Sequence, residues 1–175
     1  MRKITRSLAI PSLFPKTVES WEAFEKTIRF LEKHRFTQME FYHPPGHDRD
    51  IRRLFESARF SSVMIAVLAL KGAGFSLCSP DKEERSRAVS LLKSCMDRAA
   101  ETGTHSVMVN SGFLPAFDPV LKKVSATAEQ IRSPCDAYVS SIEEAAEYGE
   151  KQNYNIKLLL EPVNMKSRQR KHWGV

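Results

Sequence analysis

The chain has 175 residues, enough for one domain with a sizeable hydrophobic core. With 42% hydrophobic and 27% charged residues, its composition is that of an ordinary globular protein. No apolar run approaches the roughly 20 residues that span a bilayer, which argues against a membrane protein. Pro11 and Pro15 interrupt the apolar stretch that follows the basic N-terminus, which argues against a signal peptide.

The net charge is +6, and much of the excess lies at the two ends, in residues 1–6 and 165–175. The middle of the chain mixes both signs, as a solvated surface does, so we expect no nucleic-acid partner. The three cysteines, Cys78, Cys95 and Cys135, are an odd number without C-x-x-C spacing. They indicate reduced thiols in a cytoplasmic protein rather than a disulfide framework or a zinc site.

The first part of the chain predicts two strands and two helices. Residues 4–10 form the first strand, and residues 20–34 form a helix whose apolar side chains recur at helical spacing. A second strand covers residues 38–42. Asp48 is placed to cap a short helix that continues to residue 55.

The middle of the chain predicts a third strand and a long helix. Residues 62–70 are almost wholly apolar without period-two alternation, which suits a strand covered on both faces. A glycine-containing loop, residues 71–80, leads to the helix, for which Ser79 is the expected cap and Pro80 the first position. The helix continues to residue 102 and stops at a glycine.

The last part of the chain predicts a fourth strand at residues 106–110 and a long polar loop at residues 113–125. A helix at residues 136–152 and a fifth strand at residues 156–161 follow. This alternation of apolar, β-rich runs with amphipathic helices is typical of a parallel sheet with crossover helices.

Two architectures produce this alternation, an open doubly wound sheet and a closed eight-fold barrel. The turn after the first strand, residues 11–15, contains no glycine, and neither G-x-G-x-x-G nor a Walker A motif occurs in the sequence. A nucleotide-binding sheet is therefore disfavoured. We predict an α/β fold, a partial TIM (β/α)8-like barrel of about four β/α units plus a fifth parallel strand.

In a barrel, the chemistry lies where strands end and loops begin. The carboxyl ends of the predicted strands supply Glu40, Lys71, Asn110 and Glu161. Glu161 follows three leucines of a strand that we expect to be buried, where desolvation of a carboxylate calls for a positive partner such as a metal or a lysine. The alternative is that Glu161 simply leaves the strand into solvent.

Glu40 also has two interpretations: it binds substrate, or it points into the barrel interior and pairs with Lys71 or Arg6. His43 and His47 are separated by Pro-Pro-Gly, so we interpret them as loop histidines rather than as a metal site.

We interpret Asp81 as a helix cap and expect it to form an i,i+4 ion pair with Arg85. We prefer this interpretation to a substrate-binding role for the two residues.

The segment L-C-S-P-D-K-E-E-R-S-R-A-V, which starts at Leu77, resembles the third β/α unit of the sugar phosphate isomerases/epimerases, the xylose-isomerase-like TIM barrels. In that family a loop of the type L-x-S-x-D-x-x-x-R opens a helix that ends in A-x-x-x-G, as at Ala99 to Gly103. Met39-Glu40 and Leu160-Glu161-Pro162 match the second and fifth strands. The resemblance covers residues 4–164 and is specific for the superfamily rather than for a substrate.

The resemblance implies an enzyme that uses a divalent metal ion (Mn²⁺, Mg²⁺, Zn²⁺ or Co²⁺) to isomerise or epimerise a sugar or sugar phosphate. The reaction would proceed by proton transfer alpha to a carbonyl. A glutamate that ends strand five is a metal ligand and an acid/base in the family, and Glu161 matches it. Glu40, Lys71 and Asn110 would line the substrate pocket.

The family's other ligands come from strands six to eight, and residues 165–175 carry no strand pattern. We therefore expect the N-terminal portion of a barrel domain in residues 1–164 and a basic tail in residues 165–175. The expectation is a truncated chain that is inactive alone. Two alternatives stay open: a non-catalytic half-barrel that covers its sheet edges as a homo-oligomer, and an endonuclease IV-like nucleic-acid enzyme.

Overall fold

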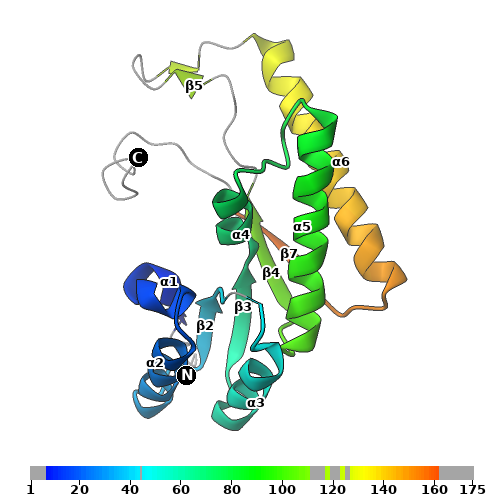
Figure 1. Ribbon diagram of the computed structural model, residues 1–175. Coiled ribbons are helices and arrows are strands. Elements are labelled where there is room, and N and C mark those ends of the chain that lie inside the picture. Colours follow the sequence, from blue (N-terminus) through cyan, green and yellow to red (C-terminus); the bar gives the residue numbers. More distant parts are fainter. Residues whose placement is uncertain (1–6, 44, 111–116, 119–122, 125–126, 162–175) are drawn as a thin grey trace, which may run out of the picture.

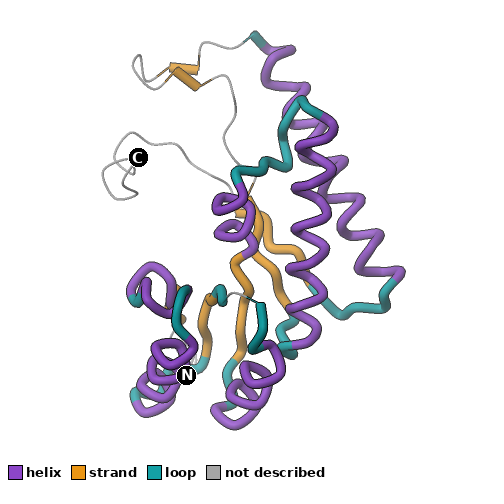
Figure 2. The backbone as a smooth tube through the Cα atoms, in the orientation of Figure 1, coloured by secondary structure: helices purple, strands orange, loops and turns teal. Residues whose placement is uncertain are grey.

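The computed structural model describes residues 7–43, 45–110, 117–118, 123–124 and 127–161. Its centre is a five-stranded parallel sheet with helices packed on it (Figure 1, Figure 2). The strands of this sheet are β1 (Ser7–Ala9), β2 (Gln38–Phe41), β3 (Ser61–Ile65), β4 (Ser106–Asn110) and β7 (Lys157–Glu161). The α-helices are α1 (Ile10–Leu13), α2 (Trp21–Lys33), α3 (Asp48–Ala58), α4 (Ala66–Ala73), α5 (Lys82–Glu101) and α6 (Ala128–Lys151). A 3-10 helix (Pro15–Val18) and an antiparallel pair of two-residue strands, β5 (Phe117–Asp118) and β6 (Lys123–Val124), complete the described elements.

The order of the strands in the sheet, β1-β2-β3-β4-β7, is their order along the chain, and all four pairings are parallel. Each strand is therefore followed by a crossover that returns the chain to the next position of the sheet. This confirms the predicted α/β fold of successive β/α units with a fifth parallel strand. Within the described part of the chain, β1 and β7 are the edge strands.

One face of the sheet packs against the helices. Residues that share a face alternate along each strand, and the register aligns them between strands. The buried strand residues of this face are Met39, Phe41, Met64, Val107 and Val109, and all belong to the main hydrophobic core. The helices contribute Phe24, Ile28, Leu31, Ile51, Phe55, Leu92 and Met96, among others.

The opposite face of the sheet is called the open face here. Its residues include Ala9, Glu40, Val63, Ile65, Ser106, Met108, Asn110, Lys157, Leu159 and Glu161. Of these, only Val63 is buried, and it lies outside the main core cluster. In a closed barrel such residues fill the interior in layers. The described residues thus form one wall of a barrel.

The helix predicted at residues 20–34 is confirmed, because α2 covers Trp21–Lys33. Ser20 is its N-cap and accepts a hydrogen bond from the backbone N–H of Ala23 at 3.3 Å. Phe24, Ile28 and Leu31 form its fully buried stripe. The strand predicted at residues 106–110 matches β4 at both ends.

The predicted third strand, residues 62–70, is wrong in its second half. β3 ends at Ile65, and α4 begins at once with Ala66. A short apolar run has the same pattern in a buried strand and in a buried helix, so periodicity alone does not separate them. Alanine and leucine favour the helix, and Gly74 ends it in the left-handed conformation at φ 70°.

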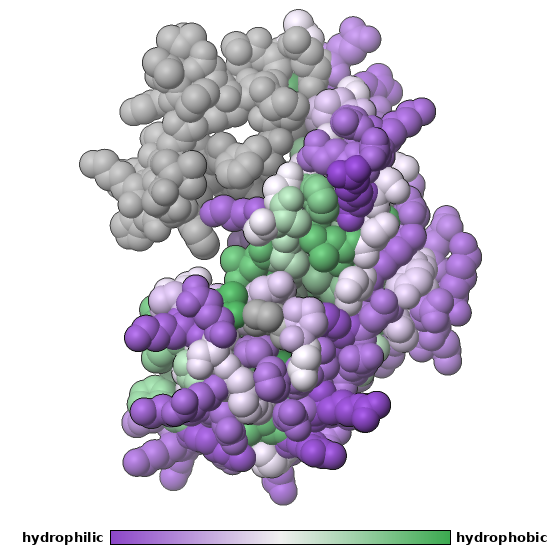
Figure 3. All heavy atoms as spheres, in the orientation of Figure 1, coloured by the Kyte–Doolittle hydropathy of each residue, from purple (hydrophilic) through white to green (hydrophobic). Residues whose placement is uncertain are grey.

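Around α4, apolar side chains reach the surface beside the polar outer faces of the longer helices (Figure 3). Val67 and Leu68 are partly exposed there, whereas Leu70 is buried.

Two predicted helix caps, Asp48 and Ser79, are wrong, and the cap predicted at Asp81 is confirmed. Asp48 is the first residue of α3 instead of its cap, and its carboxylate accepts hydrogen bonds from Arg98. The cap of α5 is Asp81, which accepts from the backbone N–H groups of Glu83 and Glu84, and not Ser79. A proline at the expected first position misled the prediction, because the helix begins two residues later.

The first and last predicted elements differ from the structure in their bounds. β1 covers Ser7–Ala9, whereas residues 4–6 of the predicted strand and the predicted tail, residues 165–175, lie outside the described residues. Helix α6 begins at Ala128 rather than at residue 136. The prediction started this helix just after Pro134, but Pro134 lies inside α6, in its second turn, and the helix continues through it without one intrahelical hydrogen bond.

Helices α5 and α6 lie side by side and are joined by a shared carboxylate (Figure 1). Asp97 of α5 accepts hydrogen bonds from Tyr148 of α6 at 2.7 Å and from Tyr154, in the connection to β7, at 2.9 Å. Gly149 leaves room for the methyl group of Met96, which would lie 2.8 Å from a Cβ at that position. None of the described helices is both long and apolar enough for a membrane span.

The shared carboxylate predicts a pH effect. The hydrogen bond to Asp97, and to a smaller extent desolvation, raises the pKa of Tyr148 to about 12. The separate hydrogen bond from Tyr154 to Asp97 raises the pKa of Tyr154. Because folding raises these pKa values, the stability that they contribute is fully present below pH 10 and is lost as the pH rises to about 12. An Asp97→Asn variant should therefore form phenolate at lower pH, as followed by ultraviolet absorbance. Tyr138, whose pKa is raised by burial, should titrate as before.

Candidate functional site

The carboxyl edge of the sheet brings two of the predicted site residues together. Asn110 ends β4 and Glu161 ends β7, and the parallel register pairs these two residues directly. Paired residues of a parallel sheet point to the same side, so both belong to the open face. An amide and a carboxylate therefore lie next to each other at the edge where barrel enzymes carry their chemistry.

Glu161 is exposed, and β7 is exposed with it. The expectation of a buried fifth strand is therefore wrong. Leu159 and Leu160 are 38% and 52% exposed, because β7 pairs only with β4 in the described part of the chain. The prediction of a desolvated carboxylate depended on that burial. In the described structure Glu161 instead matches the alternative, a carboxylate that faces solvent.

Glu40 also belongs to the open face, but it lies lower on the sheet. It pairs with Val63, and the register carried through β3 and β4 places it level with Ser106 and Lys157. Three strand spacings of about 4.8 Å and four residues of about 3.3 Å separate it from Glu161, roughly 20 Å in a flat sheet. The described fold therefore places Glu40 on the same face as Glu161 and away from it.

Lys71 does not end a strand. It belongs to the last turn of α4, the helix that replaces the second half of the predicted third strand, and it is exposed. Since α4 directly follows β3 and contacts β4, Lys71 still belongs to the carboxyl side of the sheet. Its side chain is thus carried by a helix rather than by a strand end.

The two histidines after β2 belong to an aromatic cluster. His43 is buried, and its ring packs edge-on against Phe24 at 5.1 Å between centroids. His47 stacks on Trp21 at 4.7 Å, with 11° between the ring planes, and its Nδ1 lies 3.7 Å from Asp50. The described residues contain no group of three or more His, Cys, Asp or Glu side chains that could hold a metal ion.

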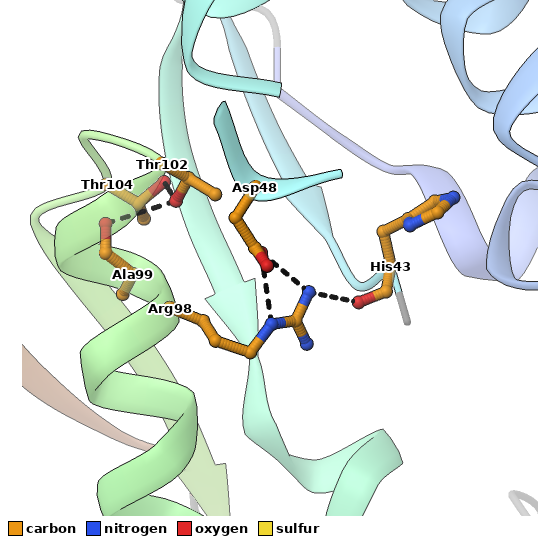
Figure 4. A network of polar contacts seen from close by, with 6 residues as sticks. All are labelled: His43, Asp48, Arg98, Ala99, Thr102 and Thr104. Carbon is orange, nitrogen blue, oxygen red and sulfur yellow. Dashed lines mark hydrogen bonds and ion pairs between the residues drawn. The ribbon is translucent and has the colours of Figure 1, made fainter. Parts of the chain in front are cut away.

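A buried ion pair fixes the segment that follows β2 (Figure 4). Arg98 of α5 donates to Asp48 Oδ1 from Nε at 3.0 Å and from Nη2 at 2.8 Å, and also to the backbone carbonyl of His43 at 2.6 Å. The side chains of Arg98 and Asp48 are only 10% and 11% exposed. These three residues, the Arg98 network, join α5 to the start of α3 and to the end of β2.

Sequence reasoning missed the Arg98 network. It gave Arg98 no role, and it assigned Asp48 to a helix cap. One signal was available, because the apolar stripe of α5 predicts that Arg98, next to Ala99 and two residues after Met96, lies near the buried side. Its partner could not be identified, since Asp48 belongs to a different helix.

The residues of the loop before α5 stabilise that loop. Ser79 donates from its hydroxyl to Glu84 at 2.7 Å, and Arg85 donates from Nη1 to the carbonyl oxygen of Ser79 at 2.7 Å. Asp81 caps the helix as predicted, but the predicted ion pair between Asp81 and Arg85 is wrong, because Arg85 is bound to the loop backbone instead. These side chains hold a turn at the carboxyl side of the sheet.

A parallel sheet whose strand order follows the chain, with the core helices on one face, is the arrangement of a β/α-barrel protein. The sequence matches the xylose isomerase-like TIM barrel family over residues 21–171, and the chain belongs to that family.

Solved structures with the same fold include a D-tagatose 3-epimerase-like protein, at a TM-score of 0.65 and 18% identity, with 90% of this chain and 52% of that chain covered. An AP endonuclease of family 2 from Brucella melitensis is similar at a TM-score of 0.66 and 16% identity, with 96% and 57% covered. The IolI protein, solved with a bound zinc atom, is similar at a TM-score of 0.62 and 16% identity, with 91% and 52% covered.

At 16–18% identity, the similarity to these solved structures shows the fold alone. The chain spans about half the length of the solved structures that it matches. No curated protein sequence matches the chain significantly.

Proposed function

We propose that this chain carries one half of the active site of a sugar or sugar phosphate isomerase/epimerase that depends on a divalent metal ion. The observation that supports this most is the direct pairing of Asn110 and Glu161 on the open face, at the carboxyl edge of a sheet of this family. The similar structures include a D-tagatose 3-epimerase-like protein and an L-ribulose 3-epimerase, which supports the substrate class.

Glu161 would be one ligand of the metal ion. A carboxylate oxygen is a donor that Mn²⁺ and Mg²⁺ prefer, and Zn²⁺ also accepts it, so the residue fits the group chemically. Such ions take several ligands, and the described residues contain no group of three or more His, Cys, Asp or Glu side chains that could hold one. The ligands that complete the site would therefore come from outside the described residues, which by themselves would bind metal weakly.

When bound, the metal would polarise the carbonyl of the sugar. Glu161 would move a proton at the carbon next to that carbonyl, since an exposed carboxylate at the strand end can reach a bound substrate. Asn110, its neighbour, would donate its amide N–H to a hydroxyl or carbonyl oxygen of the sugar. Lys71 would contact substrate from α4, whereas Glu40 lies too far down the open face to reach a sugar held at Glu161.

The protein would act in the cytoplasm. Three cysteines without C-x-x-C spacing, two of them buried, support a reducing compartment. Burial raises the pKa of the Cys95 thiol to about 11, so this side chain stays a neutral core residue at physiological pH.

The test measures Mn²⁺ binding by calorimetry and ketose epimerisation by chromatography, with the full chain. Replacing Glu161 with glutamine should weaken Mn²⁺ binding by roughly tenfold or more, because the amide carries no charge. Glu143→Gln, on the exposed face of α6, is the matched control and should bind as before.

Equal Mn²⁺ affinity of the Glu161 variant and the parent chain would refute the metal site. Epimerisation that survives the substitution unchanged would refute the catalytic role. Incision of DNA by the parent chain, without any action on ketoses, would favour the nucleic-acid enzyme instead.

A further inference from the structure

A charged groove lies between α3 and the end of α5, on the helix side of the sheet. Its volume is about 450 Å³, and it is lined by Arg49, Arg52, Arg53, Glu56 and Glu101. The first four residues belong to α3, and the fifth is the last residue of α5. Helix α3 connects β2 to β3, and α5 leads to β4, so both walls belong to the middle strands of the sheet. The groove is therefore separate from the open face and from both edge strands.

The two walls of the groove are held together. Arg98 of α5 donates two hydrogen bonds to Asp48, the first residue of α3, and both side chains are nearly buried (Figure 4). One turn further along α3, the side chain of Arg52 reaches Gly103, just beyond the end of α5. Its Cγ lies 3.9 Å from the position that a Cβ would take there. A ligand would therefore meet a preformed groove and would not have to order the two helices.

One wall of the groove is basic. Its three arginines lie on the same side of α3, because residues three and four positions apart are neighbours on a helix. Arg52 donates from Nε to Glu56 at 2.9 Å. Arg53 approaches Asp50 only to 3.8 Å, beyond hydrogen-bond distance. Arg49 is exposed and forms no ion pair within the described part of the chain. Guanidinium donors in the groove are therefore available to an anion.

The opposite wall is acidic. Glu101 is exposed and ends α5, where the helix dipole already places negative charge. It forms no ion pair with another described residue, although it lines the same groove as the arginines. Two carboxylates, Glu56 and Glu101, disfavour a long polyanion such as nucleic acid by like-charge repulsion. The groove suits a small molecule that is an anion at one end and donates hydrogen bonds at the other.

We infer that this groove binds a small phosphate monoester whose other end donates hydrogen bonds, as the hydroxyl groups of a sugar do. The arginines of α3 bind the phosphate, because a guanidinium presents paired N–H donors that match its oxygens. Glu101 accepts from a hydroxyl group of the same molecule. The volume of about 450 Å³ is within the range of small-molecule sites. The inference does not depend on the proposed activity, since the groove shares no residue with the candidate site.

NMR titration of the full, isotope-labelled chain with glucose 6-phosphate, inorganic phosphate and glucose tests this site. Glucose 6-phosphate should shift the amide signals of α3 and of residues 101–103, with a Kd in about the millimolar range, because the groove is open to water. Inorganic phosphate should bind roughly fivefold more weakly, since it lacks the hydrogen bond to Glu101. Glucose, without the phosphate, should not shift these signals.

Two variants with the same loss of charge locate the phosphate. Arg49→Gln should weaken the binding of glucose 6-phosphate by roughly tenfold, because it removes a charged donor that has no other partner in the described structure. Arg132→Gln is the matched control: Arg132 is 82% exposed on α6, outside the groove, and its replacement should leave the Kd unchanged. Equal affinity of Arg49→Gln and the parent chain would refute the site, as would a parent chain without saturable shifts at α3.

A third variant separates the groove from the proposed substrate site. Glu161→Gln should bind glucose 6-phosphate at α3 with the parent affinity, whether or not it retains epimerase activity. Loss of the α3 shifts in Glu161→Gln would place the phosphate at the candidate site and refute the groove. Equal affinity for glucose 6-phosphate and inorganic phosphate would contradict an ester ligand. A single-stranded oligonucleotide that binds α3 more tightly than glucose 6-phosphate would also overturn the inference, in favour of a polyanion.

Discussion

Replacing Arg98 with methionine is expected to lower the free energy of unfolding by about 3 to 5 kcal/mol. Asp48 would keep its charge at a side-chain exposure of 11% without a cation beside it, and the carbonyl of His43 would lose its 2.6 Å hydrogen bond. Methionine retains the length and packing of the side chain, so the loss reports the charge and the hydrogen bonds. Urea unfolding followed by circular dichroism measures it.

A second change separates the ion pair from a general defect in packing. The double variant Arg98→Met with Asp48→Leu removes both charges and should regain part of the loss, because no buried charge is left without a partner. Arg87, which pairs with Glu83 on the exposed side of the same helix, provides the matched control. Arg87→Met should change the free energy of unfolding by less than about 1 kcal/mol. A double variant as unstable as Arg98→Met would contradict the buried pair.

The fold was predictable where local pattern and tertiary packing agree. The helix at Trp21–Lys33 has an apolar stripe and a serine cap, and the strand at Ser106–Asn110 alternates between two faces, as its burial confirms. Both elements are specified by their own residues. The parallel order follows from the alternation of strands and helices, because the crossover leaves few other arrangements.

The fold was not predictable where one pattern fits two structures. Residues 66–70 have an apolar pattern that fits both a helix and a strand, so the pattern did not show where β3 ends and α4 begins. Pro134 ends most helices but is tolerated in α6. In both cases the deciding contacts come from other parts of the chain.

Sequence reasoning predicted which residues belong to the candidate site, but not how far apart they lie in the sheet. Asn110 and Glu161 were each placed at a strand end, but their direct pairing depends on the register between β4 and β7. The same register places Glu40 three strands away from Glu161 and four residues lower on the sheet. The sequence pattern carries no information on this register. Arg98 and Asp48 show the same limit, since charge pairing across helices leaves no periodic signal.

The aromatic core beneath the carboxyl edge connects packing to the candidate site. Phe41 is the last residue of β2 and precedes the segment that Arg98 holds. Its ring lies 4.9 Å from that of Phe55, edge to face, and 6.1 Å from that of Phe24. Since it is fully buried, its packing fixes the direction in which β2 leaves the sheet.

Truncating Phe41 to alanine should therefore lower the free energy of unfolding by about 3 to 5 kcal/mol. The substitution removes a whole ring that packs on both Phe24 and Phe55, and it leaves a cavity in the core. Leu13→Ala is the control, because Leu13 is 60% exposed and outside the core, and it should cost less than about 0.5 kcal/mol. Equal losses for the two variants would show that the aromatic cluster does not stabilise this end of β2. A large loss for Phe41 alone, with an unchanged denaturant slope, would show that the strand end below the candidate site is a cooperative part of the core.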